Sequence, residues 1–238
     1  MKTLGIIPAR WNSSRFPGKM LFNVFGKTII QHTWEQTKKA STLNRIIVAT
    51  DSPEVFNECF NFGAEVVITS NKHKNGTKRC IEVLNMINED YDIIVNIQGD
   101  EPNINPDIID KLVMSLKDHP NCVCSTPISE ITKEEAKDPN TVKCVFNLFK
   151  EAMYFSRQPI PHGGPWWGHI GVYAYRKGYL MNMKNQPTTP LQKSEDLEQL
   201  NILETAKYIN VVPVQHKVIG IDVLADVKKF IKYYLNIV

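Results

Sequence analysis

Short apolar runs that are nearly free of polar residues recur through the first half of the chain. They lie at 4–7, 45–50, 65–69 and 92–97. Near-continuous apolar character is typical of parallel strands that are covered on both faces. Between and after these runs, the spacing of apolar residues predicts helices near 28–40, 53–62, 77–88 and 106–118. The pattern therefore predicts an α/β fold in which a mostly parallel sheet is flanked by helices.

The second half of the chain has a different pattern. Strand-like segments are found at 123–127, 141–147 and 168–176, with a charged helix at 132–137 and a loop rich in Pro, Gly and Trp at 158–167. A helix is predicted at 195–207, with Ser194 as its N-cap and with Glu195 and Asp196 in its first turn. A strand near 209–214 and a helix near 224–235 follow. This half predicts a mixed-sheet excursion from the parallel core, within one continuous domain over 1–238.

Composition narrows the range of functions. The 238 residues include 28 basic and 25 acidic side chains, which give a formal charge of only +3. Such a balance argues against nucleic acid or a membrane surface as the main partner. The apolar run at 4–7 is too short for a signal peptide, because Pro8 and Arg10 interrupt it, and no later segment has the length of a membrane span. We therefore expect a soluble, cytoplasmic protein, and we expect its five cysteines to be reduced and partly buried.

Three cations follow the first strand within a short loop. Arg10, Arg15 and Lys19 are set among small residues and prolines, and cations in such a loop can bind a polyanion such as a polyphosphate. The loop is not a Walker-type phosphate loop, which needs Gly in place of Ser13 and Ser or Thr in place of Met20. It also lacks the Gly-rich fingerprint of a dinucleotide-binding dehydrogenase.

Polar residues stand where each predicted parallel strand ends, and such ends converge at one edge of a sheet. One of these ends is the sequence Gln98-Gly99-Asp100-Glu101-Pro102, in which the Asp100 carboxylate suits a hard cation such as Mg²⁺. Asp222 offers a second carboxylate, which could bind the metal, cap the last helix, or do both. Other residues leave alternatives open, since Arg79 fits an anion site or a solvated turn, His169 a pocket or a structural role, and Arg157 a pocket or the surface.

The motifs of this chain appear in an order that resembles one enzyme family. They are Ile7-Pro8-Ala9-Arg10, Ser13-Ser14-Arg15, Pro17-Gly18-Lys19, Ala49-Thr50-Asp51, Gly76-Thr77 with Arg79, Asn96 to Pro102, Tyr154 to Arg157, His169 to Tyr173, Leu197 to Leu200, and Gly220-Ile221-Asp222. The series is similar to 3-deoxy-manno-octulosonate cytidylyltransferase, the CMP-Kdo synthetase of lipopolysaccharide biosynthesis, over nearly the whole chain.

The resemblance implies a nucleotide-diphospho-sugar-transferase-like fold, related to the Rossmann fold, in a Mg²⁺-dependent homodimer. It implies that CTP and Kdo give CMP-Kdo and pyrophosphate. The catalytic residues would be Arg10, Arg15, Lys19 and Asp100, and the metal ligands Asp100 and Asp222. The nucleotide would contact Ala9, Arg10, Lys19, Gly76, Thr77, Arg79 and Gln98. The sugar would contact Arg15, Gln98, Arg157, His169, Tyr173, Glu198 and Gln199, with Arg157 as a partner for its carboxylate.

Two positions depart from the family pattern. Lys78 stands where an acidic residue is usual, and Asn201 stands where Arg is usual. We expect the Lys78 side chain to face solvent, since Arg79 already matches the family's inward cation. The close alternative is a CMP-sugar synthetase for a related acid, such as 8-amino-Kdo or a sialic-type acid. A non-catalytic nucleotide-binding regulator is the alternative from another class, and the retention of both Asp100 and Asp222 argues against it.

Overall fold

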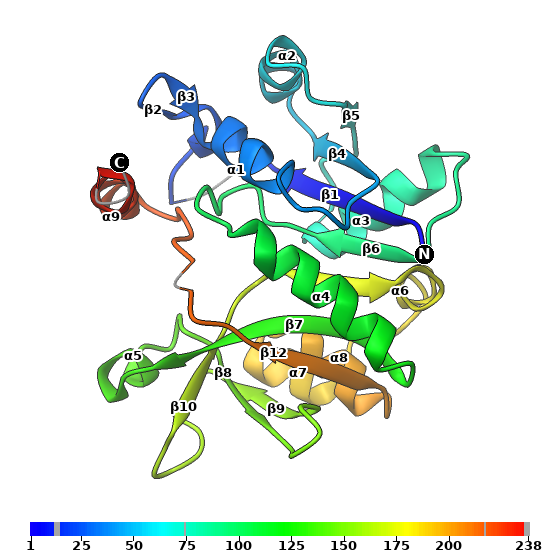
Figure 1. Cartoon of the computed structure of the whole chain (residues 1–238), viewed down its shortest axis with the longest axis vertical. Coiled ribbons are helices and arrows are strands. Elements are labelled where there is room, and N and C mark those ends of the chain that lie inside the picture. Colours follow the sequence, from blue (N-terminus) through cyan, green and yellow to red (C-terminus); the bar gives the residue numbers. More distant parts are fainter. Residues whose placement is uncertain (12–14, 74, 217, 236–238) are drawn as a thin grey trace. The chain divides into compact units, whose positions relative to one another are not determined.

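The computed structural model describes residues 1–11, 15–73, 75–216 and 218–235. The chain forms two compact units, of which unit 1 comprises Met1–Asp110 with Val218–Val238 and unit 2 comprises Lys111–Lys217. Figure 1 shows the elements of both. The expectation of one continuous domain stays a prediction.

Unit 1 is built on four parallel strands. They are β1 (Thr3–Ala9), β4 (Arg45–Thr50), β5 (Val66–Ile68) and β6 (Ile93–Asn96), in the order β5-β4-β1-β6. Every residue of the central strand β1 is buried, and Ile6 is paired with Ile47 on one side and Asn96 on the other. The near-continuous apolar runs therefore predicted the parallel strands correctly.

Side-chain hydrogen bonds cap some of the helices in unit 1. The helices are α1 (Ile29–Thr37), α2 (Pro53–Asn61), α3 (Gly76–Met86), α4 (Pro106–Asp118, in which the boundary between the units falls) and α9 (Leu224–Leu235). The Ser52 hydroxyl accepts a bond of 3.2 Å from Val55 N at the start of α2, and Asn75 Oδ1 accepts one of 2.9 Å from Lys78 N at the start of α3.

The segment that follows unit 2 returns to the unit 1 core. Ile221, Val227 and Phe230 form one buried cluster with Val24 and Ile29. A 3₁₀ turn, η1 (Lys19–Leu21), and a small hairpin, β2 (Asn23–Val24) and β3 (Lys27–Thr28), precede α1 and were not predicted. The burial of this apolar cluster fixes the segment that carries Asp222.

Unit 2 contains a mixed sheet around the long strand β7 (Cys122–Ile131). Strands β10 (Trp166–His169) and β11 (Tyr173–Arg176) are antiparallel to β7, and β12 (Tyr208–Pro213) is parallel to it. Beyond β10 lie β8 (Lys143–Phe146) and β9 (Ala152–Ser156), which pair antiparallel. The predicted mixed sheet is confirmed, although β9 was not predicted.

Two predicted elements of unit 2 are interrupted. The prediction of a single helix over 195–207 is wrong. Asp196 has a φ of +53° and separates α7 (Pro190–Glu195) from α8 (Gln199–Glu204). Ser194 therefore lies inside α7, whose capping residue is Thr189. The strand expected over 168–176 is broken by a three-residue turn, in which Val172 N donates to Ile170 O at 2.9 Å.

The remaining helices of unit 2 are α5 (Lys133–Lys137) and α6 (Lys177–Met183), and α6 was not predicted. All five cysteines are buried and free, as expected. In the part of the chain that the structure describes, every helix is too short or too polar to cross a bilayer.

Gly99 allows the loop after β6 to pass close to β1. Its N–H donates to Pro8 O at 3.3 Å, and a Cβ at this position would lie 2.8 Å from the same backbone oxygen. An added methyl group must therefore push two backbone segments apart. The missing side chain of Gly99 thus sets the place of the next residue, Asp100.

We expect Gly99→Ala to lower the free energy of unfolding by about 1–3 kcal/mol, because overpacking against a backbone atom cannot relax locally. Gly178→Ala is the matched control, since a Cβ there meets nothing within 4 Å and the residue lies in α6. This control should be neutral or stabilising by about 0.4–1 kcal/mol. Urea unfolding followed by circular dichroism compares the two variants, and equal effects would contradict the close-approach argument.

Candidate functional site

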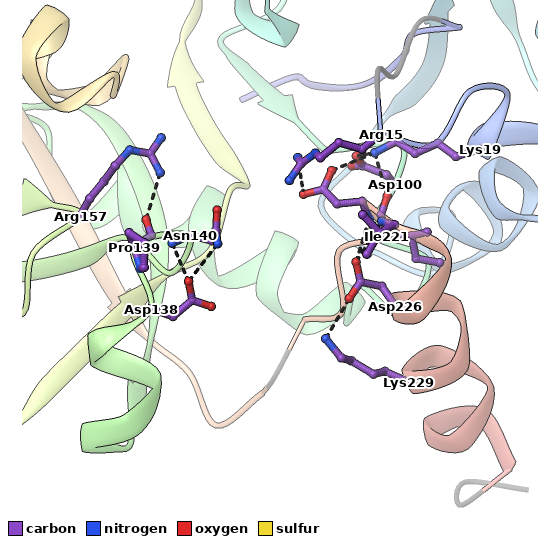
Figure 2. Close-up of polar contacts among 12 residues, drawn as sticks. Arg15, Lys19, Asp100, Asp138, Pro139, Asn140, Arg157, Ile221, Asp226 and Lys229 are labelled. Atoms are coloured by element: carbon purple, nitrogen blue, oxygen red, sulfur yellow. Dashed lines mark hydrogen bonds and ion pairs between the residues drawn. The ribbon is translucent and has the colours of Figure 1, made fainter.

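Lys19 is the centre of a polar cluster in unit 1. Its side chain is almost entirely buried, and its Nζ donates to Asp100 Oδ2 at 2.5 Å, to Ile221 O at 2.7 Å and to Asp222 Oδ1 at 3.2 Å. An ammonium group has three donors, and this arrangement uses all three. Figure 2 shows Lys19 and Arg15 gathered with Asp100 and the segment at Ile221. The predicted cation and the two predicted metal ligands are therefore in contact.

The segment before α9 is held to the end of β6 by main-chain and side-chain bonds. Ile221 N donates to Asp100 O at 2.9 Å, and Arg15 Nη2 lies 3.0 Å from Asp222 Oδ2 in an exposed ion pair. The start of α9 is capped by Asp226, whose Oδ2 accepts from Asp222 N and Val223 N at 3.1 Å. The Asp222 carboxylate is thus directed to the cations, and Asp226 takes the capping role.

Glu101 is a buried carboxyl group beside this cluster. Burial is the main cause that raises the pKa of Glu101 to about 8, and the nearby charges of Asp100 and Asp222 add to the shift. Its Oε2 has no hydrogen-bond partner among the described residues. At neutral pH the protonated form dominates, so Glu101 adds little negative charge to a site that already holds two carboxylates.

The raised pKa of Glu101 makes the stability depend on pH. Between the usual pKa of 4.5 and the folded value of about 8, the native state binds more protons than the unfolded state. The contribution of Glu101 is therefore present in full below about pH 4.5 and is lost as the pH rises through about 8. With EDTA present, we expect Glu101→Gln to gain stability relative to wild type between about pH 5 and 8, by at most about 1.4 kcal/mol per pH unit.

Urea unfolding of both proteins across this pH range measures the difference. Glu134→Gln, at a highly exposed carboxylate in unit 2, is the control and should give a nearly constant difference. A difference for Glu101→Gln that is also constant with pH would contradict the raised pKa.

Arg79 is fully buried and links three segments of unit 1. Its Nη2 donates to Asp51 Oδ2 at 2.9 Å, its Nη1 donates to Thr69 Oγ1, and Nε has no partner among the described residues. The other oxygen of Asp51 accepts a bond of 2.9 Å from Trp11 N, at the start of the cationic loop. Arg79 therefore lies in the interior, joined to the loop through Asp51, and its role in nucleotide binding stays a prediction.

Because the Arg79–Asp51 pair is buried, removal of the cation leaves an uncompensated carboxylate. We expect Arg79→Met to lower the free energy of unfolding by about 3–5 kcal/mol. Arg45→Met is the matched control, since Arg45 forms ion pairs with Glu65 and Glu89 that are substantially exposed, and it should cost at most about 1 kcal/mol. Denaturant unfolding of both variants measures the two losses of unfolding free energy. Similar losses would contradict the larger contribution expected for the buried Arg79–Asp51 pair.

The other residues predicted to contact the nucleotide surround the end of β1. Ala9 is buried, Arg10 is exposed, Gln98 is partly exposed, and Gly76 and Thr77 form the first turn of α3. A Cβ on Gly76 would lie 3.2 Å from the Pro8 ring and 3.3 Å from Asn96 Oδ1, so that α3 begins close to β1 and β6. Lys78 is exposed, which confirms the expectation that it faces solvent. Ser13 and Ser14 lie outside the described residues.

Five of the seven predicted sugar-binding residues lie in unit 2, since Arg15 and Gln98 belong to unit 1, and three of the five form one group. The His169 and Tyr173 rings are 5.3 Å apart between centroids, and Tyr173 Oη donates to Gln199 Oε1 at 3.3 Å. Glu198 directly precedes Gln199 at the start of α8. Phe155 packs edge-on against His169 with a centroid distance of 5.2 Å. The break between β10 and β11 thus leaves the His169 and Tyr173 rings in contact.

Arg157 donates to backbone carbonyls. Its Nη1 lies 3.1 Å from Pro139 O (Figure 2), its Nε 2.9 Å from Glu195 O, and its Nη2 3.3 Å from Asp196 O. The fully buried Lys143 completes this arrangement by donating to Arg157 O and to Asp138 O. The Arg157 guanidinium therefore fixes local backbone here, and its contact with a substrate carboxylate stays a prediction.

The comparisons with known proteins are consistent along the whole chain. A family profile described as cytidylyltransferase matches residues 4–209. A mitochondrial 3-deoxy-manno-octulosonate cytidylyltransferase of Arabidopsis thaliana is 44% identical over 96% of this chain and 81% of the relative. The enzyme of the same name from Chlamydia trachomatis serovar L2 is 42% identical over 98% of this chain and 94% of its own. The chain belongs to the 3-deoxy-manno-octulosonate cytidylyltransferase family.

A solved structure supports the same relationship. CMP:2-keto-3-deoxy-manno-octonic acid synthetase, in complex with CTP, matches this chain with a TM-score of 0.95 and 35% sequence identity, over 100% of both chains. The predicted mostly parallel α/β fold is therefore that of the cytidylyltransferases.

Within this cytidylyltransferase, some polar residues of the two clusters were not assigned from sequence. Asp51 and Glu101 were seen only as parts of motifs, because nothing in the chain order shows that they face Arg79 and the Asp100–Asp222 pair. Lys143 could have been singled out from sequence, because it is a lone cation in a strand-like run. Thr126, whose hydroxyl lies 2.8 Å from His169 Nε2, could not, because a Thr in a strand is ordinary.

Asn201, the other departure from the family pattern, is buried and donates to Pro187 O at 2.8 Å and to Gln192 Oε1 at 3.2 Å. It therefore fixes the segment before α7 against α8. The usual Arg would have to place a longer, charged side chain in this buried position.

Proposed function

We propose that this chain transfers the cytidylyl group of CTP to 3-deoxy-D-manno-octulosonate (Kdo) and releases pyrophosphate. The observation that carries the proposal is the contact of Lys19 with both Asp100 and Asp222, in a chain of this family. Relatives that share more than 40% of their residues carry the name of this activity, and the matched solved structure holds CTP.

The reaction needs no nucleophile from the protein. The anomeric hydroxyl of Kdo attacks the α-phosphorus of CTP, a new P–O bond forms, and the bond to the bridging oxygen of pyrophosphate breaks. The hydroxyl proton passes to water. Both substrates are anions, so the protein must offset their repulsion and align them, and alignment alone can supply about 7–11 kcal/mol of the barrier reduction. The five buried, free cysteines are consistent with a reaction that does not use them.

Arg10, Arg15 and Lys19 supply the positive charge for the triphosphate. Arg15 forms an exposed ion pair with Asp222, which is weak and easily exchanged for a phosphate oxygen. Lys19 already uses its three donors, so it binds a phosphate only by exchanging one of its bonds to Asp100, Asp222 or Ile221. As charge develops on the leaving pyrophosphate, such a cation is most effective in the transition state.

The donor set fits Mg²⁺. One or two carboxylates together with substrate phosphates are the usual ligands of this ion, and Asp100 and Asp222 each place an oxygen within 3.2 Å of the same Nζ atom. These two residues would hold the ion, whose chemistry is to neutralise and orient phosphate oxygens. The described residues contain no group of three His, Cys, Asp or Glu side chains fit for a metal, which leaves further ligands to nucleotide and water.

In unit 2, the sugar acid would be contacted by Arg157, His169, Tyr173, Glu198 and Gln199. The family resemblance also supports a cytoplasmic homodimer that serves lipopolysaccharide synthesis. Leu148 and Phe149, at the turn between β8 and β9, are 100% and 74% exposed, and Met153 beside them is 64% exposed. An exposed apolar group of this kind supports a protein interface there, with a second copy as the partner.

We expect Asp100→Asn to reduce turnover at least about a hundredfold while leaving the protein folded, because the change removes a charge at constant size. Asp110→Asn is the control, since this carboxylate of unit 1 bonds to Ser41 and Thr42 at the surface, and turnover should stay within about twofold. Pyrophosphate release with CTP, Kdo and Mg²⁺ is the assay, and near-normal turnover of folded Asp100→Asn would contradict the proposed role of Asp100.

The same assay on the wild type, with Kdo, 8-amino-Kdo and a sialic-type acid in turn, tests the substrate. We expect the largest kcat/KM with Kdo. A larger value with another acid would favour the alternative CMP-sugar synthetase, and no pyrophosphate release with any acid would favour a non-catalytic nucleotide-binding protein.

A further inference from the structure

The Thr126 hydroxyl is buried at a junction of three polar groups in unit 2. Its Oγ1 lies 2.8 Å from His169 Nε2, 2.8 Å from Val172 O and 3.3 Å from Ile170 O. Thr126 is fully buried in β7, so no water competes for these bonds. The two carbonyls belong to the turn that separates β10 from β11, directly after His169.

The numbers of hydrogens and lone pairs on these groups decide which group donates to which. A hydroxyl has a single hydrogen and two lone pairs, and a carbonyl oxygen can only accept. The Thr126 hydrogen is therefore donated to Val172 O or Ile170 O, so the Thr126 oxygen must accept a hydrogen from His169 Nε2. The opposite arrangement, in which Thr126 donates to a bare Nε2, leaves Val172 O without this bond at a buried position, which costs about 1–3 kcal/mol, whereas Ile170 O still accepts from Val172 N.

The imidazole of His169 is accordingly neutral with its hydrogen on Nε2. Burial lowers the pKa of His169 to about 3, so the ring stays neutral at physiological pH. A neutral ring with Nε2–H carries a lone pair on Nδ1. The structure gives Nδ1 no hydrogen-bond partner among the described residues, and His169 is partly exposed. Phe155 and Tyr173 pack on the ring and hold its orientation.

We propose that Thr126 is a positioning residue, which locks His169 in the Nε2–H form and so presents Nδ1 as a hydrogen-bond acceptor for a hydroxyl group of the sugar acid. The assignment of the ligand rests on the proposed function. A bare Nδ1 accepts from a hydroxyl and offers nothing to a carboxylate, which has no hydrogen at neutral pH. The pair therefore distinguishes the hydroxyl-bearing part of the substrate from its acid group.

The tautomer is measured first, in the free protein and without substrate. Two-bond ¹H–¹⁵N correlation spectra distinguish a protonated from a bare imidazole nitrogen, and a His169→Gln sample assigns the signals. In wild type we expect Nε2 protonated and Nδ1 bare. Thr126→Ser, which keeps the hydroxyl, should preserve this pattern, whereas Thr126→Val, which keeps the shape, should give a mixture or the other tautomer.

Steady-state kinetics then separate positioning from folding. Thr126→Val should raise the KM for Kdo about tenfold, as expected for one lost hydrogen bond of about 1.4 kcal/mol, with the KM for CTP within twofold. Thr126→Ser should restore the KM for Kdo. A general loss of structure would instead change both KM values together and lower the melting temperature.

Two substitutions of His169 keep the proposal testable if Thr126→Val does not fold. The amide of Asn reaches the place of Nδ1, and the amide of Gln reaches the place of Nε2. His169→Asn keeps an acceptor for the sugar, whereas His169→Gln keeps only the bond to Thr126. We therefore expect a lower KM for Kdo with His169→Asn than with His169→Gln.

The proposal is overturned if wild-type His169 carries its hydrogen on Nδ1, or if Thr126→Val changes neither the tautomer nor the KM for Kdo. The reverse order of the two His169 variants also overturns it. Absence of turnover with CTP and Kdo would instead overturn the proposed function, and the tautomer in the same sample would still decide the role of Thr126.

Discussion

One buried ammonium group holds the polar centre of unit 1 together. Asp100, Glu101 and Asp222 bring three carboxyl groups into a small volume, and like charges at such separations repel strongly in a medium of low dielectric constant. The Lys19 ammonium directly offsets the charges of Asp100 and Asp222. Glu101 adds no third negative charge, because it retains its proton at neutral pH. The turn at η1, the end of β6 and the segment before α9 are therefore placed by a requirement for charge balance.

The basic residues of the family motifs fall into two physical classes. Arg79 and Arg157 are bonded to protein groups, one to a buried carboxylate and a hydroxyl, the other to backbone carbonyls. The flat guanidinium fork suits such fixed, directional contacts. Arg10 and Arg15 are exposed, and Arg15 forms an exposed ion pair with Asp222. A basic residue of a family motif can thus hold the surrounding protein in place instead of facing solvent.

Sequence patterns predicted unit 1 well because β1 and β6 are buried along their whole length and because α2 and α3 carry local caps. The Ser52–Pro53 start of α2 is an example, since the signal and the structure involve adjacent residues. Unit 2 was less predictable. Asp196 breaks the expected helix by adopting a left-handed conformation, and the turn at Ile170–Val172 is stabilised by Thr126, more than forty positions earlier.

The contrast between local signals and distant contacts also decides how much of the candidate site could be predicted from sequence. The ends of parallel strands converge, so Asp100 could be placed beside the cationic loop from sequence. The orientation of Arg79 toward Asp51, and the three bonds of Lys19, could not, because the partners are 28 to 203 positions apart. Which side chain fills a buried position is decided by packing and desolvation, which no local pattern encodes.

The late position of Asp222 in the chain has a consequence for synthesis on the ribosome. Chains emerge from the N-terminus, and the residues of unit 2, Lys111–Lys217, are made between Asp100 and Asp222. A nascent chain can therefore form the β1–β6 sheet and pair Lys19 with Asp100 while the second carboxylate does not yet exist. The carboxylate pair is completed only after all of unit 2 has been translated, so an unfinished chain lacks one of the two carboxylates that contact Lys19.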